Sequence, residues 1–351
     1  MQPFEFSGIS TRVVFGAGTL SKLPEELARL GAQSPFIVST AQQIDAAHDL
    51  EARIGATISG IYAGAVMHTP TDVTARALEA FRASDADCIV AIGGGSTIGL
   101  SKALATRTGA NQLVIPTTYA GSEMTDILGE TENGRKVTRR DPSIRPETVI
   151  YDVDLTLTLP PQLTTTSALN AIAHGIEALY APDANPILSL MAGEAMSAFA
   201  EALPLVMAEP GNSDARARVL YGAWLCSTTL GYITMGLHHK LAHVLGGSFG
   251  TPHAETHAIL IPHVAAFNAE AAAEQLAPVA RAFGSTGGGL WDFAKSCGAP
   301  MRLSDLGLTR DDIARATAIA AESPYSNPRP VSQDAIHAIL EAAWEGRRPI
   351  A

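Results

Sequence analysis

The chain has 351 residues, of which 46% are hydrophobic and 17% charged, and its formal net charge is −11. These values predict two domains with large cores and exclude a disordered or fibrous chain. No run of Lys and Arg is longer than Arg139-Arg140, so nucleic acid and anionic membranes are not expected as partners.

The cysteines and the N-terminal residues predict a cytoplasmic protein. Cys88, Cys226 and Cys297 are odd in number and lack metal-site spacing, which fits a reducing compartment. The first residues show no basic segment followed by an apolar one, and no window is expected to supply the roughly 20 apolar residues that span a bilayer.

The N-terminal part of the chain alternates short β-branched runs with segments of helical periodicity, which is typical of a parallel α/β sheet. The predicted strands are residues 35–40, 87–92 and 112–115, and the predicted helices are residues 20–30 and 73–83. A basic stretch from Arg135 to Arg140 is expected in a hairpin.

The composition changes near residue 163, after which Ala-rich helical segments follow one another. Helices are predicted at residues 166–180, 187–199, 215–231, 238–245, 271–283, 309–321 and 333–344. The turn residues between 152 and 161 mark the boundary, so we divide the chain into an α/β domain at residues 1–157 and an all-helical domain at residues 158–351. The glycines at 287–289 are interpreted as a flexible loop.

A glycine-rich turn follows the strand at residues 87–92 and leads into a helix. Its sequence is Gly93, Gly94, Gly95 and Ser96. Glycines let the backbone approach a pyrophosphate closely, and free N–H groups at a helix start favour an anion. A plain strand-to-helix turn is the alternative interpretation.

Hydroxyl side chains follow the next strand, at Thr117, Thr118 and Ser122. Two such turns at neighbouring carboxyl ends of strands are where open α/β sheets bind nucleotides. The strand predicted at residues 35–40 ends in Ser39-Thr40. It lacks the carboxylate that usually rejects a 2′-phosphate at this place in a dinucleotide-binding sheet. We therefore expect both NADH and NADPH to be accepted.

Several motifs together resemble the iron-containing alcohol dehydrogenases. They are FGAG at 15–18, LPEEL at 23–27, GGGS at 93–96, PTT…GSE at 116–123, HGIEA at 174–178, LAHVLG at 241–246, TPH at 251–253 and IPHVAAFN at 261–268. The resemblance implies a dehydroquinate synthase-like fold, with an α/β N-terminal dinucleotide-binding domain and an all-α C-terminal domain. It also places Lys136 near the nicotinamide ribose, Thr40 where Asp is often found, and Gly99 where the GGGSxxDxxK pattern has Asp.

Histidines repeat at helical spacing in the second domain. Asn170 and His174 are four residues apart, as are His239 and His243, and His253 follows a short turn. These side chains converge if the two predicted helices pack together. A single buried histidine, by contrast, is more often a satisfied core residue.

In metal-dependent members of the family that the chain resembles, the ligands are an Asp and three His. The matching positions here are Asn170, His174, His239 and His253, so the anionic ligand is missing. Because a divalent cation binds a neutral amide less tightly than a carboxylate, we expect no metal. Three histidines that hold Zn²⁺ with a water remain the alternative.

Asn170, Lys240 and the sequence PTTYAGSEMT at 116–125 resemble the maleylacetate reductases within that family. The resemblance implies NAD(P)H-dependent reduction of the carbon–carbon double bond of maleylacetate to 3-oxoadipate, in bacterial breakdown of aromatic compounds, by a homodimer without a metal. The substrate would be a small dicarboxylate. A solvated surface position is the alternative for Lys240.

The expected roles follow from the chemistry of the side chains. Asn170 and Lys240 would hold a substrate carboxylate, and His243 or His253, with His239 and His174 beside them, would supply a proton. Spacing does not separate His243 from His253. The competing functions are a metal-dependent alcohol or aldehyde reductase of the same fold and a non-catalytic dinucleotide sensor.

Overall fold

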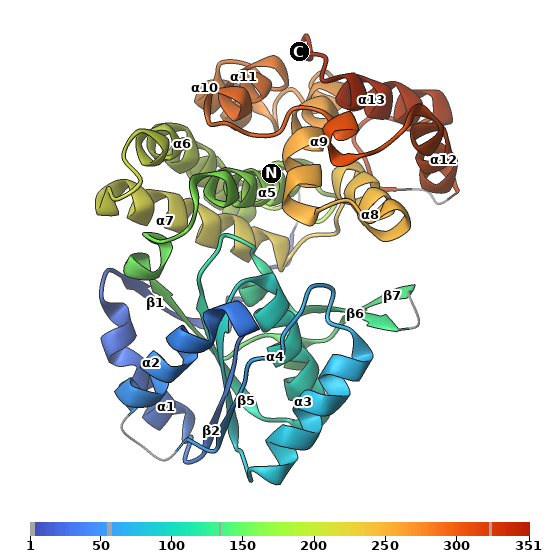
Figure 1. Ribbon diagram of the computed structural model, residues 1–351. Coiled ribbons are helices and arrows are strands. Elements are labelled where there is room, and N and C mark those ends of the chain that lie inside the picture. The colour runs from blue at the N-terminus through green and yellow to red at the C-terminus, as the bar shows by residue number, and fades with distance from the viewer. Residues whose placement is uncertain (1–3, 55–57, 133–134, 323–324) are drawn as a thin grey trace. The chain divides into compact units, whose positions relative to one another are not determined.

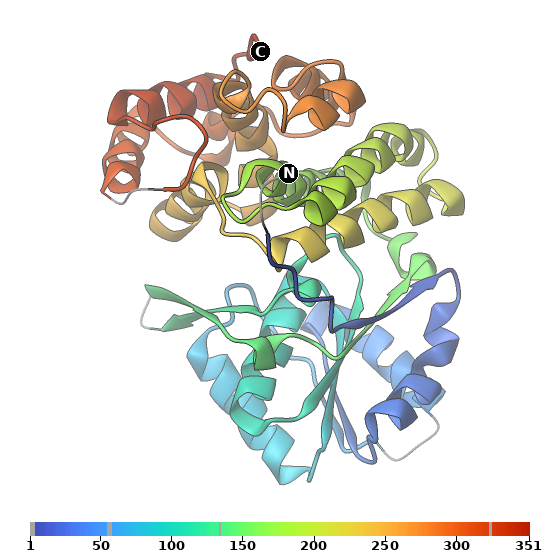
Figure 2. The same cartoon turned by 180° about the vertical axis from the view of Figure 1, so that it is seen from behind.

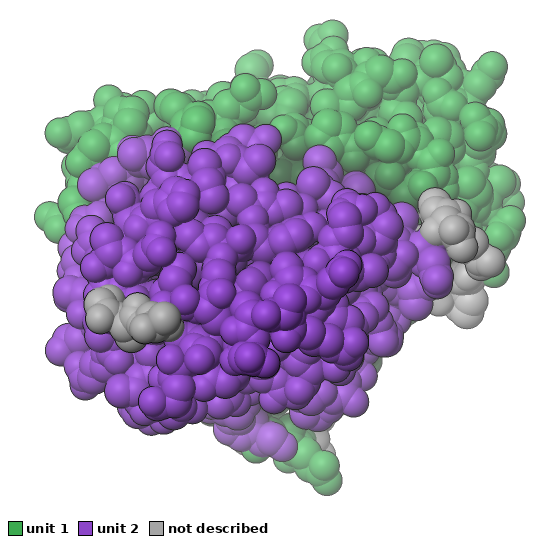
Figure 3. Space-filling view, turned by 60° about the horizontal axis from the view of Figure 1, so that its bottom comes forward, with its two compact units in different colours: residues 1–6, 160–351 green, residues 7–159 purple. Residues whose placement is uncertain are grey.

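The computed structural model describes residues 4–54, 58–132, 135–322 and 325–351, and Figures 1 and 2 show it from opposite sides. The chain forms two compact units, coloured separately in Figure 3. One unit is Ser7–Leu159, and the other contains Pro160–Ala351 together with residues 4–6. The division made from the sequence placed residues 4–6 in the other unit.

The unit Ser7–Leu159 is built on a parallel sheet, which confirms the predicted α/β class. In the described part of this unit six strands lie in the order β1-β8-β5-β4-β2-β3. The strands are β1 (Arg12–Gly16), β2 (Pro35–Val38), β3 (Gly60–Tyr62), β4 (Cys88–Gly93), β5 (Asn111–Pro116) and β8 (Thr148–Asp152). The helices are α1 (Leu23–Leu30), α2 (Ile44–Ile54), α3 (Thr71–Ala83) and α4 (Gly95–Thr108).

Alternate residues of each central strand serve opposite faces of the sheet. Val90 and Ile92 of β4 belong to one apolar cluster with Leu23 of α1 and Leu50 of α2. Figure 1 shows α1 and α2 on that face and α3 and α4 on the other. Because both faces are covered, β4 and β8 are apolar throughout most of their length and buried at every position.

The predicted strands at 35–40, 87–92 and 112–115 are found as β2, β4 and β5. The expected hairpin is also present, with β6 (Ile127–Glu132) antiparallel to β7 (Arg135–Arg140). Three strands were not predicted. β3 has only three residues, and β1 is exposed or half-buried along its length, so neither carries a clear apolar run. The third, β8, is fully buried, but its sequence TVIYD has only three apolar residues in a row.

The second unit is helical throughout its described residues. Its helices are α5 (Pro161–Tyr180), α6 (Pro186–Ala208), α7 (Ser213–Leu230), α8 (Leu237–Phe249), α9 (His253–Asn268), α10 (Ala277–Phe283), α11 (Gly288–Ser296), α12 (Arg310–Ala321) and α13 (Gln333–Glu345). Helices α5, α6 and α7 lie side by side in both ribbon views (Figures 1 and 2).

Two expectations about this unit are wrong. The helix predicted at 271–283 begins only at Ala277, because Pro278 fits the first turn of a helix and not its interior. The glycines at 287–289 are not a flexible loop, since Gly288 opens α11 and the N–H of Gly289 donates to Ser285 Oγ at 2.7 Å.

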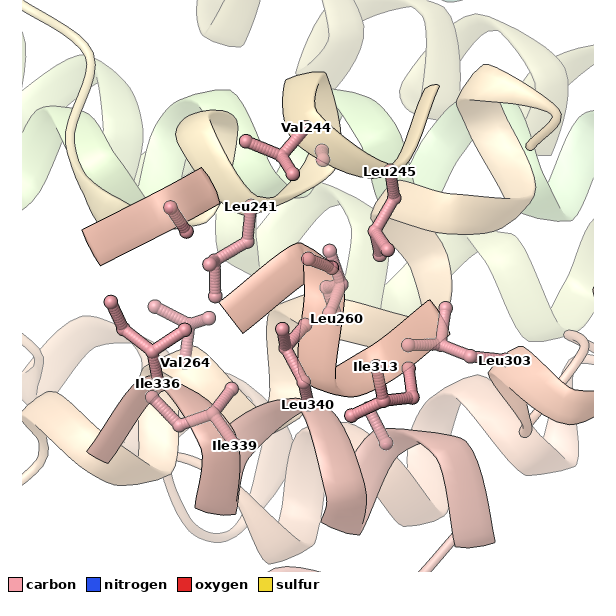
Figure 4. Close-up of a cluster of buried hydrophobic side chains, with 14 of the residues drawn as sticks. Leu241, Val244, Leu245, Leu260, Val264, Leu303, Ile313, Ile336, Ile339 and Leu340 are labelled. Carbon is pink, nitrogen blue, oxygen red and sulfur yellow. The ribbon is translucent and has the colours of Figure 1, made fainter. Parts of the chain in front are cut away.

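The core between α8, α9, α12 and α13 is apolar (Figure 4). Leu241 and Leu245 of α8 pack with Leu260 of α9, Ile313 of α12 and Leu340 of α13, and all five are at most 2% exposed. Burial of each such side chain contributes about 1.5–3 kcal/mol. This cluster keeps α8 and α9 in place, and these helices carry most of the histidines discussed below.

Helix α6 corrects the expectation that no segment could cross a membrane. By length and composition alone, its 23 residues pass that test. The buried helix of a protein core passes the same test, and Leu188, Met196 and Phe199 of α6 are fully buried against other helices of the unit. The finding is therefore weak support for a membrane span.

Lys102 of α4 is fully buried. Its Nζ donates to the carbonyl oxygens of Ser122, Thr125 and Ile127, and to the hydroxyl of Thr125. Burial lowers the pKa of Lys102 to about 7, while the nearby carboxyls of Glu123 and Asp126 act to raise it. The lysine ties α4 to the segment that connects β5 with β6.

We predict that Lys102→Met lowers the free energy of unfolding by about 2–4 kcal/mol, because it leaves buried carbonyl oxygens without a donor. Chemical denaturation measures this effect. The matched control is Lys22→Met, whose exposed ammonium pairs only with exposed Glu25 and should change stability by less than about 1 kcal/mol. Equal effects of the two substitutions would show that the buried hydrogen bonds of Lys102 contribute nothing specific.

Candidate active-site residues

The glycine-rich turn after β4 requires glycine at its first position. Gly93 has a φ of 150°, and a Cβ there would lie 2.4 Å from Thr97 Oγ1 and 2.6 Å from Gln43 Oε1. Helix α4 begins two residues later, at Gly95, and Gly95 and Ser96 are not buried. The first N–H groups of a helix have no partner within it, so this turn offers donors to an anion.

The turn after β5 lies against the glycine-rich turn. The N–H of Thr117 donates to Gly93 O at 3.1 Å, and a Cβ on Gly94 would lie 3.0 Å from Thr118 Oγ1. Within the described parts of the chain, the buried Thr118 Oγ1 has no hydrogen-bond partner. A buried hydroxyl of this kind is suited to a polar group of a ligand. Gly93, Gly94, Thr117 and Thr118 are therefore brought together as expected.

Three other residues expected at the cofactor site are not part of this contact between the two turns. Ser39 is fully buried, and within the described parts of the chain its Oγ, like that of Thr118, has no hydrogen-bond partner. Ser122 is half-buried, and its carbonyl oxygen accepts from Lys102. Lys136 lies in β7, and its side chain falls outside the described residues.

Sequence reasoning missed Gln43. It ends the short 3-10 helix Ala41–Gln43 after β2, and its Nε2 donates to Thr117 Oγ1 at 2.9 Å. The side-chain oxygen of Gln43 lies 3.5 Å from Thr40 Oγ1, within reach of that hydroxyl as an acceptor. No local pattern marks this residue, because its partner is 74 positions away.

The position of Gly99, where the GGGSxxDxxK pattern has Asp, is explained by Thr69. A Cβ at residue 99 would lie 2.4 Å from Thr69 Oγ1. Thr69 is buried and has a left-handed backbone, with a φ of 46°, and its carbonyl oxygen accepts from the N–H of Thr131 at 3.2 Å. The hydroxyl of Thr69 thus takes the space beside α4 that a side chain at residue 99 would need.

In the helical unit the expected histidines do converge. His174 of α5 stacks on His239 of α8 with ring centroids 5.2 Å apart, and the rings of His239 and His243 are 6.1 Å apart. His253 begins α9, and its ring lies 4.4 Å from that of His257. His243 is half-buried and His253 is exposed, whereas Asn170 is 3% exposed.

Two further histidines complete the cluster. His238 and His257 are fully buried, and His238 Nε2 lies 2.8 Å from His257 Nδ1, so one of the two nitrogens donates to the other. The ring of His257 is 5.1 Å from that of His239. The spacing of four residues between His253 and His257 on one helix could have predicted that His257 belongs to the cluster.

Glu177 accepts hydrogen bonds from the residues at the start of α8. Its carboxylate accepts from the backbone N–H groups of Gly236 and His238, both at 2.8 Å, and from His239 Nδ1 at 2.6 Å. Since a carboxylate only accepts, the proton of this last bond belongs to Nδ1. The Nε2 atom of His239 is buried and has no hydrogen-bond partner among the described side chains and backbone. Glu177 is three residues after His174, so helical spacing could have identified it.

Burial keeps the inner histidines of the cluster neutral. It lowers the pKa of His174, His238 and His257 well below the ordinary value, and the neighbouring histidines lower it further. Burial also lowers the pKa of His263 of α9, to about 4. A positive charge is thus disfavoured in the interior of the cluster.

Lys240 is half-buried, and its Nζ lies 4.7 Å from the centre of the Tyr325 ring. A lysine ammonium over an aromatic face makes a cation–π contact. Lys240 is therefore held in place by its own unit and is not a freely solvated surface lysine. Whether a substrate carboxylate meets it stays a prediction.

The metal site that the resemblance implies is altered at one of its four positions, Asn170. Asn170 supplies only a neutral amide, and no group of three or more His, Cys, Asp or Glu side chains in the described ranges is placed to hold a metal ion. The contact of Glu177 with His239 is of a kind that also orients metal-binding histidines. Because the anionic ligand is missing, we derive no step through a metal.

Comparisons with known proteins cover the whole chain. The protein-family model "Iron-containing alcohol dehydrogenase" matches residues 10–153 of the sequence. A second family model, "Fe-containing alcohol dehydrogenase family, C-terminal", matches residues 164–344. Maleylacetate reductase of Rhizobium sp. (strain MTP-10005) is 53% identical over 350 residues, which is 99% of this chain and 100% of that protein. Maleylacetate reductase 1 of Cupriavidus pinatubonensis is 48% identical over 351 residues, 99% of each chain. The crystal structure of maleylacetate reductase from Agrobacterium tumefaciens matches with a TM-score of 0.97 and 52% identity, and covers 99% of this chain and 100% of that one.

Because of the buried histidines, we predict that the free energy of unfolding falls at acid pH. Their folded-state pKa values lie below that of an unfolded histidine, about 6.5, so the unfolded chain binds more protons below that pH. Stability should therefore be retained above pH 6.5. It should fall as the pH drops further, by up to about 1.4 kcal/mol per pH unit for each buried histidine.

Denaturation of chelator-treated protein between pH 7.5 and 5 measures this slope. His257→Gln should make the slope shallower, and His48→Gln, at an exposed position, should leave it unchanged. A free energy of unfolding that is constant between pH 7 and 5.5 would contradict the prediction.

Proposed function

Because the chain belongs to the iron-containing alcohol dehydrogenase family, we propose that it is a nicotinamide-dependent oxidoreductase that reduces maleylacetate to 3-oxoadipate. The observation that carries the proposal is the 53% identity over the full length to a maleylacetate reductase. Two features of the site support it: Asn170 at the position of the anionic metal ligand, and Lys240 held beside the histidine cluster.

The reaction needs a hydride, a proton and a way to hold two carboxylates. A reduced nicotinamide, when bound, would supply a hydride from its C4 to the alkene carbon β to the ketone, and the electron pair of the double bond would move towards the ketone oxygen. The α carbon then takes a proton, so one NAD(P)H and one proton are consumed and NAD(P)⁺ is released. The developing enolate has to be stabilised by preorganised donors.

The residues of the helical unit supply these roles in our proposal. Lys240 and Asn170 hold a substrate carboxylate, one by charge and one by its amide N–H groups. The proton comes from His243 or His253. Both are more accessible than the inner histidines, whose low pKa makes them poor sources of a proton at neutral pH. His174 and His239 lie beside them in the cluster.

A nicotinamide dinucleotide is the cofactor that the family uses, and the turns after β4 and β5 are suited to its phosphates. We propose that NADH and NADPH both serve, since neither Ser39 nor Thr40 places a carboxylate near a 2′-phosphate. The predicted homodimer, the cytoplasmic location and the dicarboxylate partner belong to the same proposal. They rest on composition and family resemblance.

The family description implies iron, and it runs against the expectation that no metal is needed. What supports that expectation is the neutral amide of Asn170 at the position of the anionic ligand. A metal-dependent alcohol or aldehyde reductase is the competing function that the family description favours.

We predict that the protein oxidises NADH with maleylacetate and not with simple aldehydes, and that EDTA does not abolish this activity. NADH absorbance measures turnover with each substrate, before and after chelation, and metal analysis accompanies it. Loss of activity after chelation, followed by recovery with Fe²⁺ or Zn²⁺, would show that a metal is required. Turnover of aldehydes alone would establish the competing function.

We predict that Lys240→Met lowers kcat/KM for maleylacetate ten- to a hundredfold, because a charge-assisted hydrogen bond of about 1.5–3 kcal/mol is lost. Lys295→Met is the matched control, since Lys295 also lies over an aromatic ring, that of Trp291, at 5.0 Å. Of His243→Ala and His253→Ala, the substitution that removes the acid should differ in kind and lower kcat, because the acid acts as the enolate forms. A change of less than twofold in Lys240→Met would exclude Lys240 from substrate binding.

A further inference from the structure

In the described part of the unit Ser7–Leu159, the sheet has a topological switch point between β2 and β4. From β2 the chain passes through α2 to β3, and from β4 it passes through α4 to β5, and β3 and β5 lie on opposite sides of the β2–β4 pair. Helices α2 and α4 cover opposite faces of the sheet (Figure 1). Open α/β sheets bind dinucleotides outside the carboxyl ends of the two strands at such a point, where a side chain after the second strand meets the adenosine ribose.

The side chain that lies at this point is Gln43. Its Oε1 is 2.6 Å from where a Cβ of Gly93 would stand, and its Nε2 donates to Thr117 at the end of β5. It therefore touches the turns after β4 and β5 from the turn after β2. Ser39 is fully buried, and its N–H donates to Tyr62 O within the sheet. Gln43 therefore contacts both turns, whereas the backbone of Ser39 is bonded within the sheet.

We propose that Gln43 sets the preference between dinucleotides with and without a 2′-phosphate, and that as a neutral amide it lets both bind. One N–H of the amide is used by Thr117, which leaves the second N–H to donate to a phosphate. The amide oxygen has two lone pairs, so it can accept from a ribose hydroxyl besides that of Thr40. A carboxylate at the same place would accept from the ribose hydroxyl but repel the phosphate. This inference rests on the proposed nicotinamide dependence of the protein and not on its substrate.

The substitution Gln43→Glu tests the effect of a negative charge at residue 43 without a change in side-chain shape. The side chains have the same shape, and the hydroxyl of Thr117 can donate to the new carboxylate, so the link between the two turns is kept. Gln42→Glu is the matched control, because Gln42 precedes Gln43 in the same short helix but is exposed. Gln43→Lys reverses the sign of the charge.

The experiment measures dissociation constants of NADH and NADPH for the full chain by fluorescence, without any second substrate. Gln43→Glu should weaken NADPH binding about tenfold or more relative to NADH, and Gln43→Lys should shift the ratio the other way. Gln42→Glu should leave the ratio within about twofold of the unchanged protein, since an exposed charge is screened.

Equal weakening of both dinucleotides by Gln43→Glu would overturn the proposal and show that Gln43 faces the shared pyrophosphate or only links the turns. An equal shift of the ratio in Gln42→Glu would also overturn it, because the effect would then come from net charge. If neither dinucleotide binds the unchanged protein, the proposed nicotinamide dependence itself fails. Binding of dinucleotides without turnover of maleylacetate leaves the inference on Gln43 intact.

Discussion

The helical site depends on one buried carboxylate. Glu177 of α5 accepts two backbone N–H groups at the start of α8 and the ring N–H of His239. The first N–H groups of a helix have no partner inside it, so a buried negative charge at this place satisfies donors that burial would otherwise leave without partners. The same bonds hold the ring of His239 in one tautomer and orientation. The start of α8 and the histidine cluster therefore depend on the same residue.

By the resemblance to the family, three positions carry a neutral group where an acid is common. They are Thr40 after β2, Gly99 in α4 and Asn170 in α5. At residue 99 the structure shows how the change is accommodated, since the hydroxyl of Thr69 occupies the space. In our proposal the loss of these charges favours ligands that are themselves negative, namely a 2′-phosphate and a dicarboxylate. The net charge of the chain is negative, so such ligands have to be met by local groups, as Lys240 would do.

The inner histidines of the cluster are neutral, and this determines where the cluster can hold a proton. Six histidines lie within a few ångströms of their neighbours, and burial disfavours the charged form of the inner ones. A proton is therefore more readily held at the accessible rim, by His243 or His253, than in the interior. The geometry favours neither of these two over the other, because His243 contacts His239 whereas His253 contacts His257.

The sequence alone determined the features that repeat locally. The apolar runs of β2, β4 and β5, the glycine turn after β4 and the four-residue spacing of the histidines are patterns within one element, and each was found. The tertiary structure decided the partners of these residues. Glu177 and His239 are 62 positions apart, Gln43 and Thr117 are 74 apart, and no local periodicity connects such residues. It also decided that Gly288 opens a helix, since this depends on what packs against the segment.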